Sequence, residues 1–442
     1  MRGKKNVQDY RGNIFNDINT NLDDKDFKRR NTNGSKGFIR VRILTFKITF
    51  LFISQLLRRS IQRELNDFFG RINDSDYSIQ HVTKSAFTQA RSKLKPEAFS
   101  ELSLSVVNSF YRNAPYLLWG KHRILACDGS TIMLPTSKNI AADFEPTGFG
   151  PDATVERSVA KISLVYDVLN LVTLNAKIDT FKIHETTLLK KQLTEVVFMA
   201  NDILLLDRGY PSIGLLYELH HRSLGFCVRL KDNWWNEVNA MLQAKETNKI
   251  VTFKLPKKDK DLQNTFKGET DKVTVRIVVI ELGDGKKEIL CTSLTNAKEY
   301  TLDSLKQLYH FRWGIEEAYK LFKVRADLES FSGMSALSVK QDFYAGIFSM
   351  NICAAISFPI EQKVREESKG ANLKYTKTVN KTTALSMVCE CMVGVFIKKR
   401  IKRFLNILDK ILTKTTEAIR PNRSFPRNHK QKKPKSMNYK KM

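Results

Sequence analysis

The sequence predicts an α/β fold in which a mixed sheet is flanked by helices, and three observations support this class. The middle of the chain carries short apolar runs and helical patterns in the order strand, strand, strand, helix, strand, helix, strand. A β-rich stretch follows at about 231–295, and a long helical pattern at about 302–324. Strands that first follow one another and then alternate with helices are typical of a mixed sheet covered by helices.

The first part of the chain, 1–118, is expected to be a flexible N-terminus followed by a helical, DNA-binding region. Residues 1 to about 40 are polar and charged, which predicts loose order. The apolar run 43–57 is shorter than the roughly 20 residues of a membrane span, so we expect a buried helix. Two helical patterns follow, SIQRELNDFFGRI and TKSAFTQARSKL, the second with Thr83 as its N-cap and Arg91 near its end. They suit a helix-turn-helix or a plain helical bundle equally well.

The strand patterns in 119–230, the first part of the predicted sheet domain, place two aspartates at strand ends. The run RILACD ends in Asp128, and the run DILLLD ends in Asp207. Between them lie the strand patterns KISLVYDVLN and LVTLNAKI, and LGFCVRL follows. Aspartate is also a common turn former, so each residue alone could simply end its strand. Asp167, which lies inside the second strand pattern, is a competing candidate for a functional aspartate.

The remaining chain divides into three predicted parts. The stretch 231–295 contains IVTFKLP, KVTVRIVVIEL and KEILCTSL, and we expect an all-β insertion. The sheet domain resumes at 296–345 with the long helix. The part 346–442 is expected to be a helical region, and its last segment, 420–442, has many Lys and Arg and no Asp or Glu, which is typical of a disordered basic tail.

The charge of the chain points to a polyanionic partner. Its 442 residues include 74 Lys and Arg against 46 Asp and Glu, a formal net charge of +28. Such an excess favours nucleic acid, with a merely basic surface as the alternative. The six cysteines lack the spacing of a zinc site or a disulfide framework, and the N-terminus lacks an apolar signal core. We therefore expect a cytoplasmic protein that does not act in a membrane, and a DNA partner would associate it with the nucleoid.

The long helical pattern groups its polar residues in one narrow stripe. On a helix of 100° per residue, one stripe contains Tyr309, Arg312, Glu316 and Lys323. The opposite stripe is apolar and contains Phe311, Ile315, Ala318 and Phe322. The helix is therefore expected to dock by the apolar face and to present a carboxylate, two cations and a tyrosine on the other. A solvated face with helical ion pairs would show the same pattern.

The spacing of the polar stripe resembles the YREK signature of bacterial insertion-sequence transposases. The four residues of the stripe stand at the signature's spacing, within YHFRWGIEEAYKLFK. The contexts CDGST around Asp128 and LLDRGYPS around Asp207 are similar to those of the same group, as are SAFTQARSKLKPEAF and DLESFSG. The resemblance runs from about 80 to 350, and two aspartates in the right order before the signature make a chance match improbable.

The resemblance implies a ribonuclease-H-like catalytic core and a DDE transposase. In that fold the first Asp lies on the first strand, the second just after the fourth strand and the Glu on a later helix, which are the positions of Asp128, Asp207 and Glu316. It implies that these carboxylates hold two Mg²⁺ ions, with Mn²⁺ as a substitute, since both prefer oxygen ligands. The expected partners are double-stranded DNA, as transposon ends and target, and a second protomer in a synaptic homodimer.

The resemblance also implies contacts to DNA near the catalytic residues. The group commonly forms a DNA hairpin with one flipped base, so Tyr309, Arg312 and Lys323 are expected to contact phosphates. A flipped base needs an aromatic platform on which to stack, and the candidates are Trp234, Trp235 and Trp313. Core packing is expected for at least one of the first two. The alternatives to a transposase are an inactive DNA-binding remnant, a ribonuclease-H-like nuclease or resolvase, and an RNA-binding protein.

Overall fold

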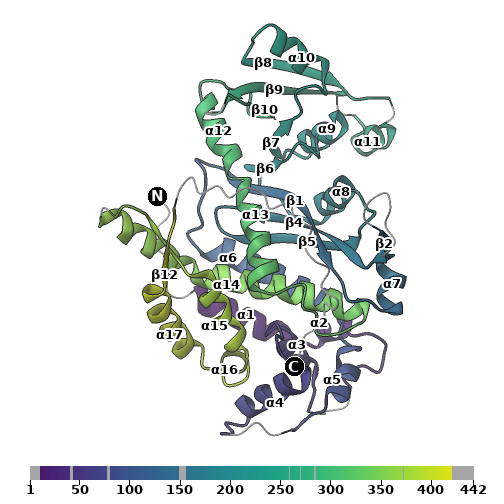
Figure 1. Ribbon diagram of the computed structural model, residues 1–442, viewed down its shortest axis with the longest axis vertical. Coiled ribbons are helices and arrows are strands. Elements are labelled where there is room, and N and C mark those ends of the chain that lie inside the picture. Colours follow the sequence, from purple (N-terminus) through teal and green to yellow (C-terminus); the bar gives the residue numbers. More distant parts are fainter. Residues whose placement is uncertain are drawn as a thin grey trace.

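One eight-stranded sheet runs through the computed structural model, which describes residues 10–39, 43–76, 80–148, 156–257, 259–268, 270–282, 285–371 and 373–420 (Figure 1). The strands lie in the order β5-β4-β1-β6-β7-β10-β9-β8. Their bounds are β1 (Arg123–Met133), β4 (Val159–Asp167), β5 (Val172–Thr180), β6 (Asp202–Leu206), β7 (Gly225–Leu230), β8 (Asn248–Lys254), β9 (Lys272–Glu281) and β10 (Lys287–Thr292). The predicted mixed sheet flanked by helices is confirmed.

The first five long strands form one half of the sheet. β4 and β5 run antiparallel beside β1, whereas β6 and β7 run parallel to it. The parallel strands β6 and β7 are joined through helix α9 (Ile213–His221), as a parallel pair requires. This half of the sheet reproduces the predicted order of strands and helices along the chain.

Helices cover both faces of this half because its strands alternate their apolar side chains. Leu125 and Cys127 point to a cluster that includes α8 (Glu185–Glu195) and α9. Ile124 and Ala126 point to a second cluster with α13 (Trp313–Lys320), α14 (Ala336–Gly370) and α6 (Glu97–Asn113). Each fully buried aliphatic side chain contributes about 1.5–3 kcal/mol to folding, so both faces hold the central strand in place.

The prediction that 231–295 is all-β is wrong. Its strands β8, β9 and β10 extend the same sheet instead of forming a separate unit, and two helices lie among them, α10 (Asn236–Gln243) and α11 (Lys260–Thr265). Val238 and Met241, three residues apart, bury one side of α10. A helix of about two turns is too short for its apolar periodicity to be recognised in a β-rich sequence. The three predicted strand runs themselves are confirmed.

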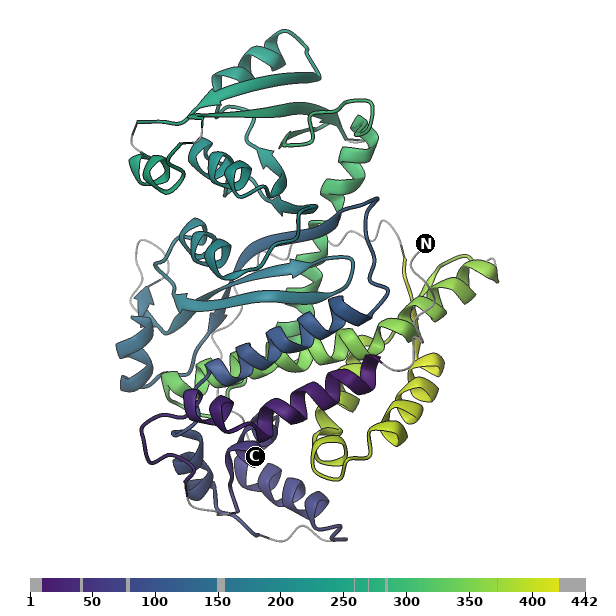
Figure 2. The same ribbon diagram turned by 180° about the vertical axis from the view of Figure 1, so that it is seen from behind.

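The prediction of a flexible N-terminus is wrong for residues 10–39. Two helices occupy this stretch, α1 (Tyr10–Asp23) and α2 (Lys25–Arg30), and α1 packs along α6 (Figure 2). Ile14, Phe15 and Ile18 are fully buried, so a narrow apolar stripe anchors an otherwise polar helix. Residues 1–9 and 40 of the predicted flexible segment lie outside the described residues.

The other predicted helices of the N-terminal region are present. They are α3 (Phe46–Ile53), α4 (Ile61–Ile72) and α5 (Lys84–Arg91). Thr83 caps α5 as predicted, because its hydroxyl accepts the N–H of Ala86 at 3.2 Å. Arg91 is buried and pairs with Asp342 at 3.2 Å, so it ties α5 to α14 and does not face a nucleic acid. A helix-turn-helix role of α4 and α5 stays a prediction.

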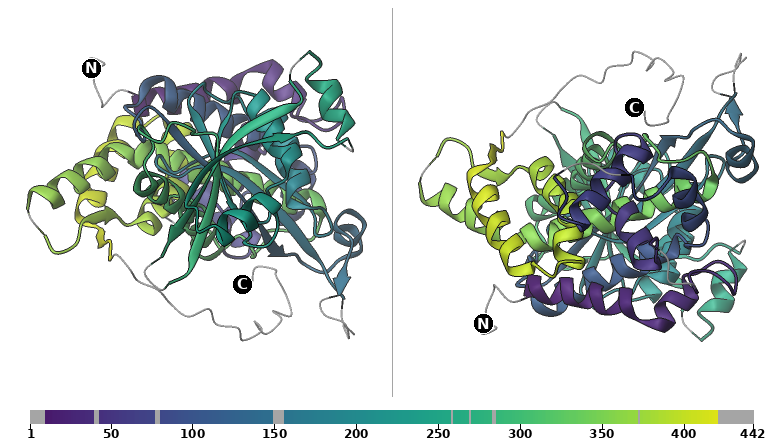
Figure 3. Two further views of the ribbon diagram at one scale, coloured as in Figure 1. Left: turned by 90° about the horizontal axis from the view of Figure 1, so that it is seen from above. Right: turned by 90° about the horizontal axis from the view of Figure 1, so that it is seen from below.

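The C-terminal helices lie to one side of the sheet (Figure 3). They are α15 (Lys381–Glu390), α16 (Met392–Phe396) and α17 (Ile401–Lys414), with a small ladder of β11 (Lys377–Val379) and β12 (Thr416–Ala418). By length and composition α14 is able to cross a membrane, but 78% of its most apolar window is buried inside the fold. The predicted disordered tail, apart from Arg420, lies outside the described residues.

Shorter elements complete the chain. Between β1 and β4 lie helix α7 (Lys138–Phe144) and a two-residue ladder of β2 (Thr147–Gly148) and β3 (Glu156–Arg157). The predicted long helix is divided into α12 (Leu302–His310), α13 and a π-helical turn, η1 (Leu321–Arg325). The third segment leads towards α14. These three successive helical segments therefore connect the part of the sheet near β9 and β10 with the C-terminal helices (Figure 1).

Candidate active site

Asp128 and Asp207 are neighbours on adjacent parallel strands. The register of β1 and β6 pairs Ala126 with Leu205, and two residues further along, Asp128 stands beside Asp207. Asp207 follows β6 directly, and its carboxylate accepts the N–H of Gly209 at 2.8 Å. The residues before them are buried on both faces of the sheet, and a slip by one residue would exchange the side chains that pack into the two separate clusters.

The prediction that β1 ends at Asp128 is wrong. β1 continues to Met133, because the residues after Asp128 pair with β4 in antiparallel register, Ser130 with Ile162 and Ile132 with Ala160. Only the parallel pairing with β6 ends before Asp128. The aspartate therefore lies in a continuous strand that is paired with β4, just beyond the point where the pairing with β6 ends.

Arg312 joins Asp128 to the third predicted carboxylate, Glu316. Its Nη2 lies 3.0 Å from Glu316 Oε1, and its Nη1 lies 3.8 Å from Asp128 Oδ2. The guanidinium is almost buried, with 8% of its side chain exposed, and it stacks on Trp313 with Cζ 4.8 Å from the ring centroid. Arg312 thus links Asp128 to Glu316, and the negative charge of Asp207 acts on Asp128 from the neighbouring strand.

The prediction that Tyr309 lies on an exposed stripe is wrong. Tyr309 is 2% exposed, and within the described residues its hydroxyl has no hydrogen-bond partner. The helix does not keep 100° per residue here, because α12 ends at His310 and the next turns use short bonds such as Arg312 N–H to Tyr309 O at 3.0 Å. The buried hydroxyl of Tyr309 is therefore not placed to contact a phosphate in this structure. The opposite apolar stripe is confirmed by the burial of Ile315 and Phe322.

Lys323 and Tyr319 tie the signature helix to the strand that carries Asp128. Lys323 Nζ donates to Ser130 Oγ at 2.6 Å and to the carbonyl of Thr131 at 2.5 Å. Tyr319 Oη donates to the carbonyl of Asp128 at 2.7 Å. These bonds hold α13 and the following turn η1 in position along β1. They also give Lys323 a structural role, in addition to any contact with DNA.

The carboxyl group of Asp128 has a raised pKa. Burial raises it first, and the negative charge of Asp207 adds to this, so the pKa reaches about 7 against an ordinary value of 3.8. The N–H of Gly129 and the charge of Arg312 oppose the shift without cancelling it. Because the two acidic side chains repel each other, a cation bound between them would be stabilising.

This pKa predicts a pH dependence for the metal-free protein. Between about pH 4 and 7 the folded state holds a proton that the unfolded chain releases, so stability falls as the pH rises through this window. Asp128→Asn should remove that contribution and stabilise the metal-free protein at pH 8 by a few kcal/mol, at roughly 1.4 kcal/mol per pKa unit. Urea unfolding at pH 5 and 8 measures this. An equal pH dependence in wild type and variant would contradict it.

The three tryptophans differ in their surroundings. Trp235 is partly buried, and its ring packs edge-on against Phe253 at 5.0 Å, which confirms core packing for one of the pair. Trp234 is 45% exposed, with the ammonium of Lys231 4.9 Å above its ring. Trp313 is 46% exposed and stacks on Arg312. Trp234 and Trp313 are therefore the rings available to a ligand.

Sequence reasoning missed Glu185, at the start of α8. Its carboxylate lies against Gly129, the residue after Asp128. An acidic residue in the first turn of a helix is ordinary, and this is why the sequence carried no signal. Asp167, the competing aspartate, has a structural role, because it is fully buried and accepts the hydroxyl of Tyr111 at 2.6 Å and the side-chain amide of Asn170 at 2.8 Å.

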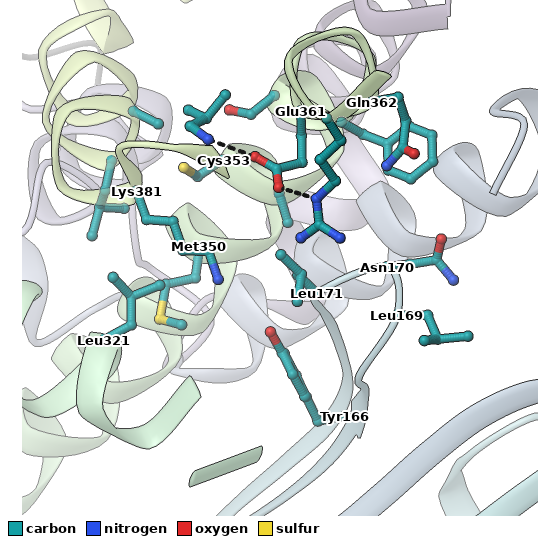
Figure 4. Close-up of a pocket in the computed structure, with 17 residues that line it drawn as sticks. Tyr166, Leu169, Asn170, Leu171, Leu321, Met350, Cys353, Glu361, Gln362 and Lys381 are labelled. Atoms are coloured by element: carbon teal, nitrogen blue, oxygen red, sulfur yellow. Dashed lines mark hydrogen bonds and ion pairs between the residues drawn. The ribbon is translucent and has the colours of Figure 1, made fainter. Parts of the chain in front are cut away.

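A mainly apolar cavity lies apart from these carboxylates (Figure 4). It has a volume of about 60 Å³ and lies between the β4–β5 turn, α14 and α15, with Tyr166, Met350 and Lys381 among its lining residues. At one wall Glu361 pairs with Arg365 at 2.5 Å. None of the predicted site residues lines it, and its size suits a few water molecules.

The donor set of the site fits a divalent cation. Carboxylate oxygens are the preferred ligands of Mg²⁺, and the Asp128–Asp207 pair carries unneutralised charge. In the part of the chain that the structure describes, no three acidic, histidine or cysteine side chains already stand at ligating distance of one point. Arg312 holds Glu316, so a cation would compete with this arginine for the same carboxylates.

The mixed sheet, its flanking helices and the paired aspartates define an α/β protein with an acidic candidate site. The chain belongs to the transposase DDE domain family, whose model matches residues 119–352. The matched region contains Asp128, Asp207 and Glu316. The predicted DDE class is confirmed, and the family depends on divalent metal ions. Membership of the YREK group in particular stays a prediction.

Two individual proteins resemble the chain. The transposase InsG for insertion sequence element IS4 of Escherichia coli (strain K12) is 27% identical over 249 residues, which are 55% of this chain and 53% of that protein. The match thus spans about half the length of this curated relative. A piggyBac transposase, solved in a synaptic complex with hairpin DNA, aligns with 97% of this chain and 86% of its own, with 11% identity and a TM-score of 0.44.

Proposed function

We propose that the protein is a DNA transposase that binds transposon terminal inverted repeats, cleaves the DNA ends and transfers them to target DNA. The observation that carries the proposal is the register that sets Asp128 beside Asp207, with Glu316 held nearby through Arg312. All three lie within the region that matches the transposase DDE domain. The formal net charge of +28 suits a DNA partner.

The proposed chemistry is phosphoryl transfer at the three carboxylates. Two Mg²⁺ ions, or Mn²⁺ in their place, would supply activation of the attacking oxygen and stabilisation of the leaving oxygen. Asp128, Asp207 and Glu316 would hold them. Arg312, nearly buried and fixed by its stacking on Trp313, keeps a positive charge at the site where the phosphate oxygens gain negative charge. Water serves as the first nucleophile, and the freed 3′-hydroxyl as the second.

The DNA contacts are proposed for side chains around these carboxylates. Arg312 and Lys323 supply donors for phosphates, and Lys323 can do so by exchanging its bond to Ser130 for one to DNA. Synapsis of two ends needs two active sites, so we propose a homodimer on DNA, acting in the cytoplasm at the nucleoid. Its C-terminal helices are the proposed contact between protomers.

Trp234 is the proposed platform for a flipped base. Trp234→Ala should slow hairpin formation about tenfold, since stacking on one base is worth about 1–3 kcal/mol, and should leave stability unchanged. Trp235→Ala, the matched control, should instead lower the free energy of unfolding by roughly 2 kcal/mol through the loss of its packing on Phe253. Hairpin assays and urea unfolding of both variants measure this. Equal hairpin rates in wild type and Trp234→Ala would contradict the assignment.

The proposed function is tested by cleavage of the element's own DNA end. Purified protein is incubated with Mg²⁺ and a duplex that carries the terminal inverted repeat, and denaturing gels follow a nick at the tip and then a hairpin. The expected result is cleavage that needs the metal and disappears in Asp207→Ala. Binding without cleavage would favour an inactive remnant. Cleavage of duplexes without the inverted repeat at the same rate would favour a nuclease.

A further inference from the structure

Glu185 approaches the active site from the face opposite Glu316. α8 begins at Glu185 and covers the face to which Cys127 points, since Cys127 Sγ lies 3.8 Å from the Gln192 side chain of the same helix. α13 covers the other face, where Arg312 meets Asp128. Neighbouring residues of a strand point to opposite faces, so Gly129 faces α8 while Asp128 faces α13.

The Glu185 side chain fills the place of the missing side chain at Gly129. A Cβ at Gly129 would stand 2.5 Å from Cδ and 2.6 Å from Cγ of Glu185, closer than real atoms approach. Gly129 lies inside β1 and is not among the described glycines with a positive φ, so its backbone would accept any residue. Any larger residue at this position would have to displace the end of the flexible Glu185 side chain.

Glu185 has no partner that would explain its position. Among the described residues it makes no hydrogen bond or ion pair, although it is half-buried and its desolvation raises its pKa. The charge of Lys161 acts on it from a distance, and the charge of Asp207 repels it. Lys161 itself donates to the carbonyl of Ile183 at 2.7 Å. A half-buried carboxylate without a hydrogen bond or ion pair costs free energy, and a bound cation would offset that cost.

We propose that Glu185 is a fourth carboxylate of the active site, which helps to bind the divalent cation from the face opposite Glu316. The proposal rests on the proposed function, because it assumes that Asp128 and Asp207 bind the metal. It differs from the three-carboxylate site that the sequence predicts. It also explains the close fit of Gly129 and Glu185, which a role as a helix-terminal acid does not require.

Metal binding without DNA tests this role apart from catalysis. The dissociation constant of Mn²⁺ is measured by electron paramagnetic resonance for wild type, Glu185→Gln and Asp303→Asn. Asp303 is the matched control, an exposed acid in the first turn of α12. Glu185→Gln should weaken Mn²⁺ binding about tenfold, as expected for a residue that supports a metal site, and Asp303→Asn should not change it. The melting temperature of metal-free Glu185→Gln should not fall.

A second variant keeps the proposal testable if Glu185→Gln folds poorly. Gly129→Ala should displace the Glu185 carboxylate and weaken Mn²⁺ binding by a similar factor. In Glu185→Gln the same glycine substitution should add no more than about twofold, because the carboxylate is already lost. Unchanged Mn²⁺ affinity in both single variants would overturn the role of Glu185. If Asp207→Asn also left Mn²⁺ affinity unchanged, the metal site of the proposed function would itself be wrong.

Discussion

Replacing Glu316 with glutamine should reduce cleavage of the transposon end by at least about 1,000-fold. Glutamine keeps the size of the side chain but removes the charge that would hold a metal ion, and loss of such a ligand costs several kcal/mol of transition-state stabilisation. It also removes the 3.0 Å ion pair with Arg312, so the guanidinium would turn towards Asp128 alone. Gel assays of single-turnover cleavage in Mg²⁺ measure the loss.

The neighbouring residue Glu317 provides the control for this result. Glu317 is 65% exposed and pairs with Lys320 on the same helix at 2.5 Å, away from the aspartates. Glu317→Gln should cleave at the wild-type rate, because an exposed helical ion pair is worth only about 0.3–0.5 kcal/mol. If Glu316→Gln retained cleavage within tenfold of Glu317→Gln, Glu316 would not be the third carboxylate.

Replacing Asp202 with alanine should lower the free energy of unfolding by about 3–5 kcal/mol. Asp202 starts β6 and pairs with Arg123 at the start of β1, at 2.8 Å and 2.5 Å, with 3% or less of either side chain exposed. The guanidinium also lies 4.6 Å from the ring centroid of Tyr111. Removal of the carboxylate leaves a buried cation without a counter-charge, which is far costlier than the loss of an exposed pair.

An exposed pair on the same sheet supplies the comparison. Asp179 pairs with Lys191 at 3.1 Å, with 32% and 50% of the two side chains exposed. Asp179→Ala should cost about 1 kcal/mol or less. Urea unfolding at pH 8 compares the two variants. Equal losses would contradict the assignment of Arg123–Asp202 as the pair that locks the starts of β1 and β6 together.

The sheet could be predicted because its strands are short apolar runs in a regular order. The runs before Asp128 and Asp207 are buried on both faces, so they read as strands without any alternation. The continuation of β1 to Met133 was not predictable, because GSTIM becomes a strand only through its pairing with β4. Likewise, α1 is mostly polar, and its narrow apolar stripe gains meaning only through packing on α6.

The candidate site was predictable where spacing along the chain carries the signal. Glu316 and Arg312 are one helical turn apart, and their ion pair follows from that spacing. The exposure of Tyr309 was predicted wrongly, because no proline or glycine before Gly314 indicates that the helix is interrupted between α12 and α13. Glu185 was missed because its meeting with Gly129 joins residues from two elements, and no local pattern reports such a contact.

The most direct test of the proposed metal-dependent site is the position of Mn²⁺ in a crystal of the protein with its DNA end. An anomalous difference map identifies the ions without reference to activity. We expect peaks at about 2.1–2.2 Å, the usual length of such bonds, from carboxylate oxygens of Asp128 and Asp207, with Glu316 released from Arg312 to bind as well. Ions bound elsewhere, with Arg312 still paired to Glu316 beside the scissile phosphate, would contradict the proposed site.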